Sequence, residues 1–278
     1  MRCRSTEATD LSSSGLREFL ERHRRLFVLT GAGCSTDSGI PDYRDADGAW
    51  KRARPVMFRD FMDEALTRQR YWARSLVGWR RFGKAQPNDT HRALANLERR
   101  NGVGTLVTQN VDRLHQAAGS TAVVDLHGRL DVVRCMNCAH RIPREQVQEE
   151  LLQLNPEWTQ LDAREAPDGD ADLDGLDFSR FKIPACRVCG GILKPDVVFF
   201  GESVPADRVT TAMQRLEAAE AVLVVGSSLM VYSGYRFAYA AAQSGKPIAA
   251  VNLGATRADD LLSLKVVQPC AAALAFLL

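Results

Sequence analysis

The stretch LFVLTGAGCSTDSGIPDYR, residues 26–44, determines the fold expected for the whole chain. It begins with an apolar run, Leu26–Leu29, which predicts a buried strand. Gly31 and Gly33 follow, and glycines at a strand end let the backbone turn sharply and approach a ligand closely. A helix starting just after them would point its N–H groups at a phosphate. Thr36 replaces the third glycine of the dinucleotide fingerprint, so a dehydrogenase fits poorly, and a tight turn without a ligand stays open.

Further apolar runs predict strands that alternate with helices. The expected strands lie at 105–107, 123–126, 197–200, 222–225, 248–251 and 265–267. Helical patterns lie around them at 12–20, 58–82, 205–219, 235–244 and 259–264, and another follows a cap at 88–90. Strands alternating with helices favour a mostly parallel sheet covered on both faces. We therefore expect an α/β fold, a Rossmann-like doubly wound sheet with two smaller modules.

Polar residues follow several of these expected strands. Gln109–Asp112, Gly226–Ser228 and Asn252–Gly254 each come directly after an apolar run, and His127 follows another. The carboxyl ends of parallel strands meet at one edge of the sheet, where ligands bind. The pattern therefore predicts a nucleotide site at that edge. From the residues alone, a single histidine such as His127 is more often a structural hydrogen-bonding residue than a catalyst.

Four of the seven cysteines form two Cys-x-x-Cys pairs, Cys135 with Cys138 and Cys186 with Cys189. Without a secretory signal, this spacing favours a metal over disulfides. Two such pairs suit tetrahedral zinc, and four cysteines leave no open coordination position, so the zinc is expected to be structural. The 47 residues between the pairs exceed a compact zinc ribbon and predict a long insertion, which is acidic from Asp162 to Asp177.

The composition is that of an ordinary globular protein. The 278 residues are 45% hydrophobic and 25% charged, with a net charge of +2. This balance gives no sign of a nucleic-acid or membrane partner, and no apolar run approaches the ~20 residues of a membrane span. Residues 1–15 lack the apolar segment of a secretory signal. We therefore expect a cytoplasmic monomer that binds neither nucleic acid nor membranes.

Together the motifs resemble the sirtuins, which are NAD-dependent protein deacylases. The resemblance rests on Gly31-Ala32-Gly33-x-Ser35, Ser38-Gly39-Ile40-Pro41-x-Tyr43-Arg44, Thr108-Gln109-Asn110-x-Asp112-x-Leu114-His115, His127-Gly128, both cysteine pairs, Val198–Glu202, Gly226-Ser227-Ser228 and Asn252. They cover the chain from about residue 16 to its end. The insertion with Ala166–Asp170, together with Leu193–Asp196 and Val231–Tyr235, resembles the class II branch, which includes the mitochondrial lipoamidase and ADP-ribosyltransferase sirtuin. Cys34 departs mildly from the family's usual isoleucine.

The resemblance implies transfer of an acyl group from acyl-lysine of a protein substrate to the ADP-ribose of NAD, with release of nicotinamide. His127 would be the general base, because the unperturbed imidazole pKa of about 6.5 suits that role, and Asn110 would hold the nicotinamide ribose. Val198 and Phe199 would pair with the substrate backbone as an added strand. The other residues implied to bind NAD are Gly31, Ala32, Gly33, Ser35, Thr36, Ile40, Pro41, Tyr43, Arg44, Gln109, Val111, Asp112, Gly226, Ser227, Ser228, Asn252, Leu253, Gly254 and Cys270.

The acyl preference depends on Tyr71 and Arg74, a Tyr-x-x-Arg similar to the pair by which desuccinylating sirtuins hold acidic acyl groups. An arginine can bind a carboxylate through two hydrogen bonds. The hypothesis is a preference for longer or carboxyl-bearing acyl groups over acetyl. The alternative, a surface arginine on an aromatic helix, stays open.

We expect three units along the chain. Residues 16–44, 88–130 and 196–278 would form the NAD-binding domain, 45–87 a cofactor loop with a small helical module, and 131–195 the zinc module.

Three rival functions remain. A mono-ADP-ribosyltransferase would differ in its products, and a zinc-ribbon nucleic-acid binder is disfavoured by the acidic insertion. An NAD dehydrogenase is disfavoured by the incomplete glycine fingerprint.

Overall fold

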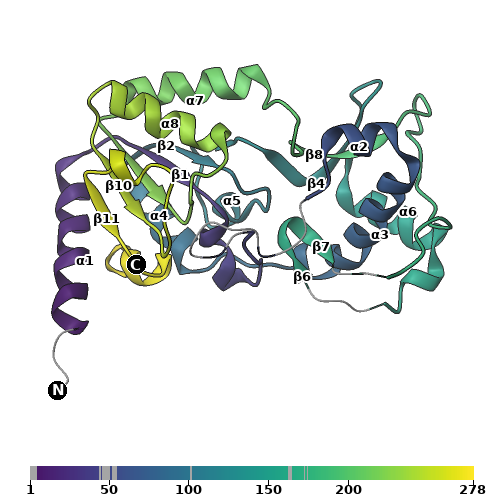
Figure 1. Cartoon of the computed structure of the whole chain (residues 1–278), viewed down its shortest axis with the longest axis horizontal. Coiled ribbons are helices and arrows are strands. Elements are labelled where there is room, and N and C mark those ends of the chain that lie inside the picture. Colours follow the sequence, from purple (N-terminus) through teal and green to yellow (C-terminus); the bar gives the residue numbers. More distant parts are fainter. Residues whose placement is uncertain are drawn as a thin grey trace.

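The computed structural model describes residues 5–43, 45, 51, 55–100, 102–161, 165–171, 173 and 175–278. These residues form a larger and a smaller lobe, side by side along the long axis of the molecule (Figure 1). The larger lobe contains a six-stranded sheet and the smaller lobe a three-stranded sheet. No helix among the described residues is both long and apolar enough to cross a membrane.

The large sheet is entirely parallel, with the strand order β11-β10-β9-β1-β2-β3. Its strands are β1 (Leu26–Thr30), β2 (Val103–Thr108), β3 (Val123–Asp125), β9 (Ala221–Val225), β10 (Ile248–Val251) and β11 (Leu264–Val266). The chain adds β2 and β3 on one side of β1 and later adds β9, β10 and β11 on the other side. The strand order therefore reverses between β1 and β9, and the predicted Rossmann-like doubly wound sheet is confirmed.

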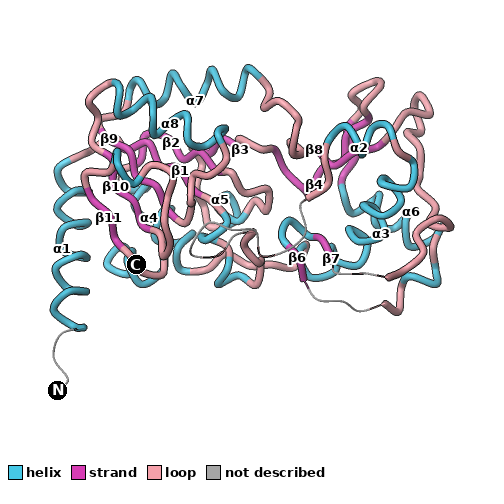
Figure 2. Tube along the Cα trace, viewed as in Figure 1, coloured by secondary structure: helices cyan, strands magenta, loops and turns pink. Residues whose placement is uncertain are grey.

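Helices cover both faces of this sheet, as Figure 2 shows. One face is covered by α1 (Ser5–Arg22), α4 (Asp89–Arg99) and α9 (Cys270–Leu274), and the other by α7 (Ala206–Ala218) and α8 (Tyr232–Gln243). Successive strand residues point to opposite faces, so Val28 packs in the first core and Phe27 in the second. Burial on both faces explains why β1 and β9 are continuous apolar runs without alternation. The short helix α5 (Leu114–Ala117) follows β2.

The smaller lobe combines an antiparallel sheet with helices from two separate segments. The sheet has the order β5-β4-β8, with β4 (Gly128–Cys135), β5 (Arg141–Pro143) and β8 (Leu193–Val197). Its helices are α2 (Phe58–Asp63), α3 (Ala65–Phe82) and α6 (Arg144–Leu154). Trp72 and Leu76 of α3 share one core with Val133 of β4 and Val147 of α6. Thus α3 packs on the cysteine-bearing segment rather than only on α2.

The insertion contributes a small hairpin to this lobe. Its strands β6 (Glu165–Ala166) and β7 (Asp170–Ala171) are antiparallel and are joined by the 3-10 turn Pro167–Gly169. The hairpin lies directly against α3, whose Gly78 faces the backbone of Gly169 and Asp170.

Three local predictions differ from the structure. The strand expected at 197–200 is instead β8, because Leu193 pairs with Cys135 of β4 and the chain leaves the sheet after Val197. The helix expected at 259–264 is only the 3-10 turn Asp259–Leu261. After β1 the chain forms two 3-10 turns, Ala32–Cys34 and Thr36–Ser38, in place of an α-helix, and Gly39 ends the second turn with φ 83°.

Candidate active site and metal centre

The predicted nucleotide residues lie at one edge of the large sheet. Gly31–Ser35 follow β1, Gln109–Asp112 follow β2, Gly226–Ser228 follow β9, and Asn252–Gly254 follow β10. These four strands are neighbours in the order β10-β9-β1-β2 and run in the same direction. The turns after β1 and β9 also flank the point where the strand order reverses. In doubly wound sheets this point is where ligands bind.

The glycines of the two central turns let those turns pack against each other. A Cβ on Gly31 would lie 2.8 Å from the Ser227 Cβ, and one on Gly33 would lie 3.0 Å from the Gly226 Cα. The Gly33 N–H donates to the Gly226 carbonyl at 2.9 Å. Gly226 itself has φ 61°, a conformation that favours glycine. Close contact between the two turns therefore accounts for these glycines, a reason the sequence did not suggest.

Asn110, Ser35 and Asp112 form a buried polar chain beside the first turn. The Asn110 Nδ2 donates to the Gly31 carbonyl at 3.0 Å and to the Ser35 Oγ at 3.1 Å. The Ser35 hydroxyl in turn donates to the Asp112 carboxylate at 2.6 Å. Burial raises the pKa of the Asp112 carboxyl, although the hydrogen bonds from Ser35 and the Leu114 N–H oppose this shift. These contacts hold the amide and the carboxylate in defined orientations.

His127 lies between β3 and β4 at the same sheet edge. Its Nδ1 donates to the Gln109 carbonyl at 3.0 Å, and its Nε2 lies 2.8 Å from the Ser233 Oγ. A carbonyl only accepts, so Nδ1 carries the proton and Nε2 of the neutral ring accepts from the Ser233 hydroxyl. The Gln109 side chain accepts from the Ser227 hydroxyl at 2.6 Å. Gln109 thus joins the imidazole to the turn after β9.

The His127 ring is neutral at physiological pH. Burial lowers the pKa of His127 to about 4, and the nearby Arg208 and Arg236 charges add to this effect. The hydrogen bond to the Gln109 carbonyl acts in the opposite direction but is smaller. A neutral imidazole whose unprotonated Nε2 accepts from a hydroxyl group has the protonation state of a general base.

Sequence reasoning did not assign a role to Ser233, although the residue lies within the Val231–Tyr235 motif. It belongs to the first turn of α8, 106 positions from His127. The neighbouring Gly234 makes this approach close, because a Cβ there would lie 2.5 Å from the Gln109 Nε2. In the sequence, only the Val231–Tyr235 motif pointed to this segment. The contact between Ser233 and His127 becomes visible only in the tertiary structure.

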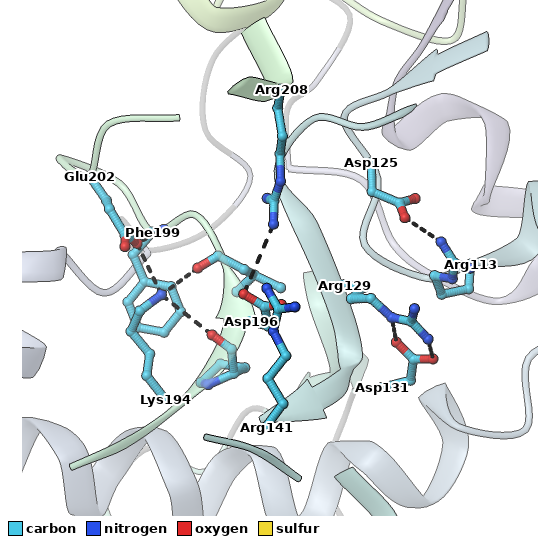
Figure 3. Close-up of polar contacts among 12 residues, drawn as sticks. Arg113, Asp125, Arg129, Asp131, Arg141, Lys194, Asp196, Phe199, Glu202 and Arg208 are labelled. Atoms are coloured by element: carbon cyan, nitrogen blue, oxygen red, sulfur yellow. Dashed lines mark hydrogen bonds and ion pairs between the residues drawn. The ribbon is translucent and has the colours of Figure 1, made fainter. Parts of the chain in front are cut away.

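Val198 and Phe199, the predicted substrate-binding residues, adjoin His127. The Val198 N–H donates to the His127 carbonyl at 2.7 Å, and the Phe199 N–H donates to the Glu202 carboxylate at 2.9 Å. Lys194 also binds Glu202, at 3.0 Å, with its Nζ 4.4 Å from the Phe199 ring centroid. Figure 3 shows Lys194 reaching Glu202 beside this ring. Lys194 was not predicted as a site residue, yet its buried ion pair braces the segment after β8.

Tyr71 and Arg74 lie on α3, near the same segment. The Tyr71 ring packs on Phe199 and on Phe61, with centroid distances of 5.1 and 5.4 Å. Arg74 does not point freely into solvent. Its guanidinium binds the carboxylate of Asp170, from the insertion.

The remaining predicted NAD residues surround these contacts. Ile40 and Pro41 line a cavity between the first turn and α3, and the Tyr43 ring contacts Phe200 edge-on at 6.2 Å. Ala32 is half-buried, Thr36 is exposed and Val111 is buried.

The last predicted NAD residues follow β10 and begin α9. The Asn252 side chain donates to the Gly254 carbonyl, with Leu253 exposed between them. Cys270 begins α9 beside Cys34, and burial raises the pKa of the Cys34 thiol. Arg44 lies outside the described residues.

The four paired cysteines meet at the end of the small lobe's sheet. Their Sγ atoms all lie within 4.8 Å of one another, with Cys135 and Cys189 at 3.5 Å and Cys138 and Cys186 at 3.7 Å. These distances exceed a disulfide bond of about 2.0 Å. Tetrahedral Zn–S bonds of about 2.3 Å place sulfurs about 3.8 Å apart, so the donor set and spacing fit zinc. The four cysteines could thus hold a structural zinc that joins β4 to the segment before β8.

The chain is similar in sequence to several named proteins. The family model of the Sir2 family matches residues 31–233. The chain is 68% identical over 272 residues to an "NAD-dependent protein deacetylase" of Xanthomonas campestris pv. campestris (strain 8004), covering 98% of this chain and 93% of the relative. It is 48% identical over 258 residues to "NAD-dependent protein lipoamidase sirtuin-4, mitochondrial" of Bos taurus, covering 92% and 82%.

Solved structures give the same result. A structure described as "Sir2-p53 peptide-NAD+" superposes with a TM-score of 0.73 at 29% identity, covering 94% of this chain and 95% of that one. The match of the family model covers β2, β3 and β9 of the large sheet and the whole of the small lobe, including the paired cysteines and His127. The chain therefore belongs to the Sir2 family, the sirtuins.

Proposed function

We propose that the protein is an NAD-dependent protein-lysine deacylase that transfers the acyl group of an acyl-lysine to ADP-ribose. One observation carries this proposal: a neutral, oriented His127 lies at the sheet edge that carries the predicted nucleotide residues, hydrogen-bonded to the residue before Asn110. The names of the relatives support it, because they describe NAD-dependent protein deacetylases and a lipoamidase. The peptide and NAD named for the solved structure support a protein substrate.

The residues at this edge suit a dinucleotide. Hydroxyl groups of Ser35 and Ser227 and the amide of Asn110 can donate to phosphate or carboxamide oxygens once they leave their present acceptors in the protein. The Asp112 carboxylate can accept from a ribose hydroxyl or an amide. Close packing of the two glycine turns brings these groups together. Bound NAD would supply the ADP-ribosyl group that receives the acyl group as nicotinamide leaves.

His127 is the residue we assign to proton transfer. The Gln109 carbonyl fixes the proton on Nδ1, which leaves Nε2 to accept a proton from a hydroxyl group. The Ser233 hydroxyl occupies that position at 2.8 Å, as a substrate hydroxyl would. The zinc would stabilise the small lobe and take no part in the reaction, because its four thiolates leave no coordination position open.

The finer proposal concerns the acyl group and the partners. We expect longer acyl groups to be preferred over acetyl, because the Tyr71 ring packs on Phe199, next to the residue bonded to the His127 carbonyl. A preference for carboxyl-bearing acyl groups would require Arg74 to leave the carboxylate of Asp170. Acylated proteins are the expected substrates. Action as a cytoplasmic monomer, without nucleic acid or membranes, remains a prediction, as does the division into an NAD-binding domain, a helical module and a zinc module.

The test is a panel of acyl-lysine peptides incubated with NAD. We expect nicotinamide release, loss of the acyl group from the peptide and an acyl-ADP-ribose product in the mass spectrum. His127→Ala should abolish turnover while the zinc content and the unfolding temperature stay at wild-type values. Transfer of ADP-ribose to protein without loss of any acyl group would instead assign the alternative function, a mono-ADP-ribosyltransferase.

A further inference from the structure

One face of α3 links the site around His127 to the inserted hairpin. Tyr71, Arg74 and Gly78 have the spacing i, i+3 and i+7, so they lie on the same face of the helix. At one end of this face Tyr71 packs on Phe199, which follows the residue bonded to the His127 carbonyl. At the other end Gly78 meets the hairpin. This face of α3 therefore extends from the segment next to His127 to the inserted hairpin.

The hairpin is docked on α3 without a gap. A Cβ on Gly78 would lie only 2.7 Å from the carbonyl carbon and oxygen of Asp170. Beside this contact lies a small, partly open pocket, which is lined by Ile40 and Pro41 of the predicted nucleotide turn and also by Gly78 and Asp170. Asp170 thus lines the same pocket as residues of α3 and of the predicted NAD site.

Asp170 occupies the carboxylate-binding edge of Arg74. The Arg74 Nε donates to one carboxylate oxygen at 2.9 Å, and its Nη2 lies 2.8 Å from the other. Two parallel bonds of this kind are the arrangement by which arginine binds any carboxylate. The side chains are only 18% and 36% exposed. Burial raises the pKa of the Asp170 carboxyl, and the Arg74 charge opposes that shift.

We infer that Asp170 is a specificity-determining residue, which keeps Arg74 from binding a carboxyl group on the substrate. The inference rests on the deacylase function proposed above. A carboxyl-bearing acyl group would have to displace a carboxylate that belongs to the enzyme, whereas a neutral chain of the same length meets no such competition. The favoured acyl groups are therefore long and neutral. Asp170 acts through Arg74 and takes no part in the chemistry.

The test compares two lysine peptides that differ only at the end of a five-carbon acyl chain, one pentanoyl and one glutaryl. Binding of each fluorescent peptide is measured by anisotropy, and turnover with NAD is measured by nicotinamide release. The variants are Asp170→Asn, Arg74→Gln and the double variant. Asp177→Asn is the matched control, because Asp177 lies in the same insertion and its hydrogen bond among the described residues is local, from Ser179.

The wild-type protein should bind the pentanoyl peptide more tightly. Asp170→Asn should tighten glutaryl binding on the order of tenfold, since a freed guanidinium forms charge-assisted bonds, and should leave pentanoyl binding unchanged. Adding Arg74→Gln should remove this gain, and it also relieves any instability caused by an unpaired arginine. A wild-type preference for glutaryl, or the same glutaryl-to-pentanoyl ratio in wild type and Asp170→Asn, overturns the inference.

The two readouts separate this inference from the proposed function. Because binding is measured without turnover, the ratio of affinities decides the role of Asp170 even if no acyl group is removed. Absence of nicotinamide release with every peptide would refute the deacylase function alone. Turnover of the neutral peptide with an unchanged affinity ratio would refute the role of Asp170 alone.

Discussion

Lowering the pH from 7.5 to 6.0 should leave the deacylase reaction almost unchanged. The quantity to follow is kcat/KM, because its pH dependence reports the ionisation of the free enzyme. In the folded protein the pKa of His127 is lowered to about 4, mainly by burial and to a smaller extent by the charges of Arg208 and Arg236. The proposed general base is therefore already neutral throughout this pH range.

The magnitude follows from the neutral fraction of the imidazole. A histidine with its ordinary pKa of about 6.5 is about nine-tenths neutral at pH 7.5 and about a quarter neutral at pH 6.0, so kcat/KM would fall about fourfold. With a pKa of about 4 the ring is still about 99% neutral at pH 6.0. We therefore expect kcat/KM to change by about a tenth or less because of His127.

The assay measures initial rates of nicotinamide release at peptide concentrations far below KM, in buffers of constant ionic strength. Circular dichroism at each pH confirms that the protein remains folded. An inflection of kcat/KM near pH 6.5, with a fourfold loss at pH 6.0, would refute the reasoning. It would show either that the imidazole of His127 is solvated in the free enzyme or that another group limits the reaction.

Three other predictions concern stability. Cys186→Ser should lose the one bound zinc and unfold at a lower temperature, because metal binding and folding are linked; full stability without zinc in metal analysis would contradict the site. Gly78→Ala should lower Tm although alanine favours a helix interior by about 1 kcal/mol, because its Cβ would press on Asp170; a raised Tm would contradict this docking of the hairpin. The pKa of buried His91 is lowered to about 4, so its contribution to the free energy of unfolding is complete above pH 6.5 and is lost as the pH falls towards 4, by about 2 kcal/mol at pH 5. His91→Gln keeps a capping residue at this position and should flatten that part of the pH dependence in urea unfolding, whereas an unchanged slope would contradict the assignment.

Much of the large sheet could be predicted from local sequence. The runs Leu26–Leu29, Val222–Val225 and Ile248–Val251 are buried on both faces, so every position in them is apolar and the pattern needs no partner to be recognised. A helix cap at 88–90 was predicted for a similar reason, and the capping residue is Asn88, whose side chain accepts from N–H groups two and three residues away. The cysteine pairs likewise carry a spacing that only a few structures use, and their sulfurs do lie together.

Predictions failed where a distant partner decides the structure. The position of β8 depends on its pairing with β4, which places Pro195 inside the strand and leaves Phe199 outside it. The same limit applies to side chains. Apolar content and turn residues could not predict which carboxylate binds Arg74, because the partner, Asp170, is 96 positions away in the sequence.

The amino-acid order alone determined the kind of fold, the cysteine donor set and the edge of the sheet that carries the polar residues, because those properties follow from hydrophobic period, local spacing and strand direction. Only the tertiary structure decided that Ser233 faces His127, that the glycine turns pack on each other and that Asp170 neutralises Arg74. Each of these is a contact between segments far apart in the chain. Such contacts depend on how whole elements pack, and no local pattern of residues records them.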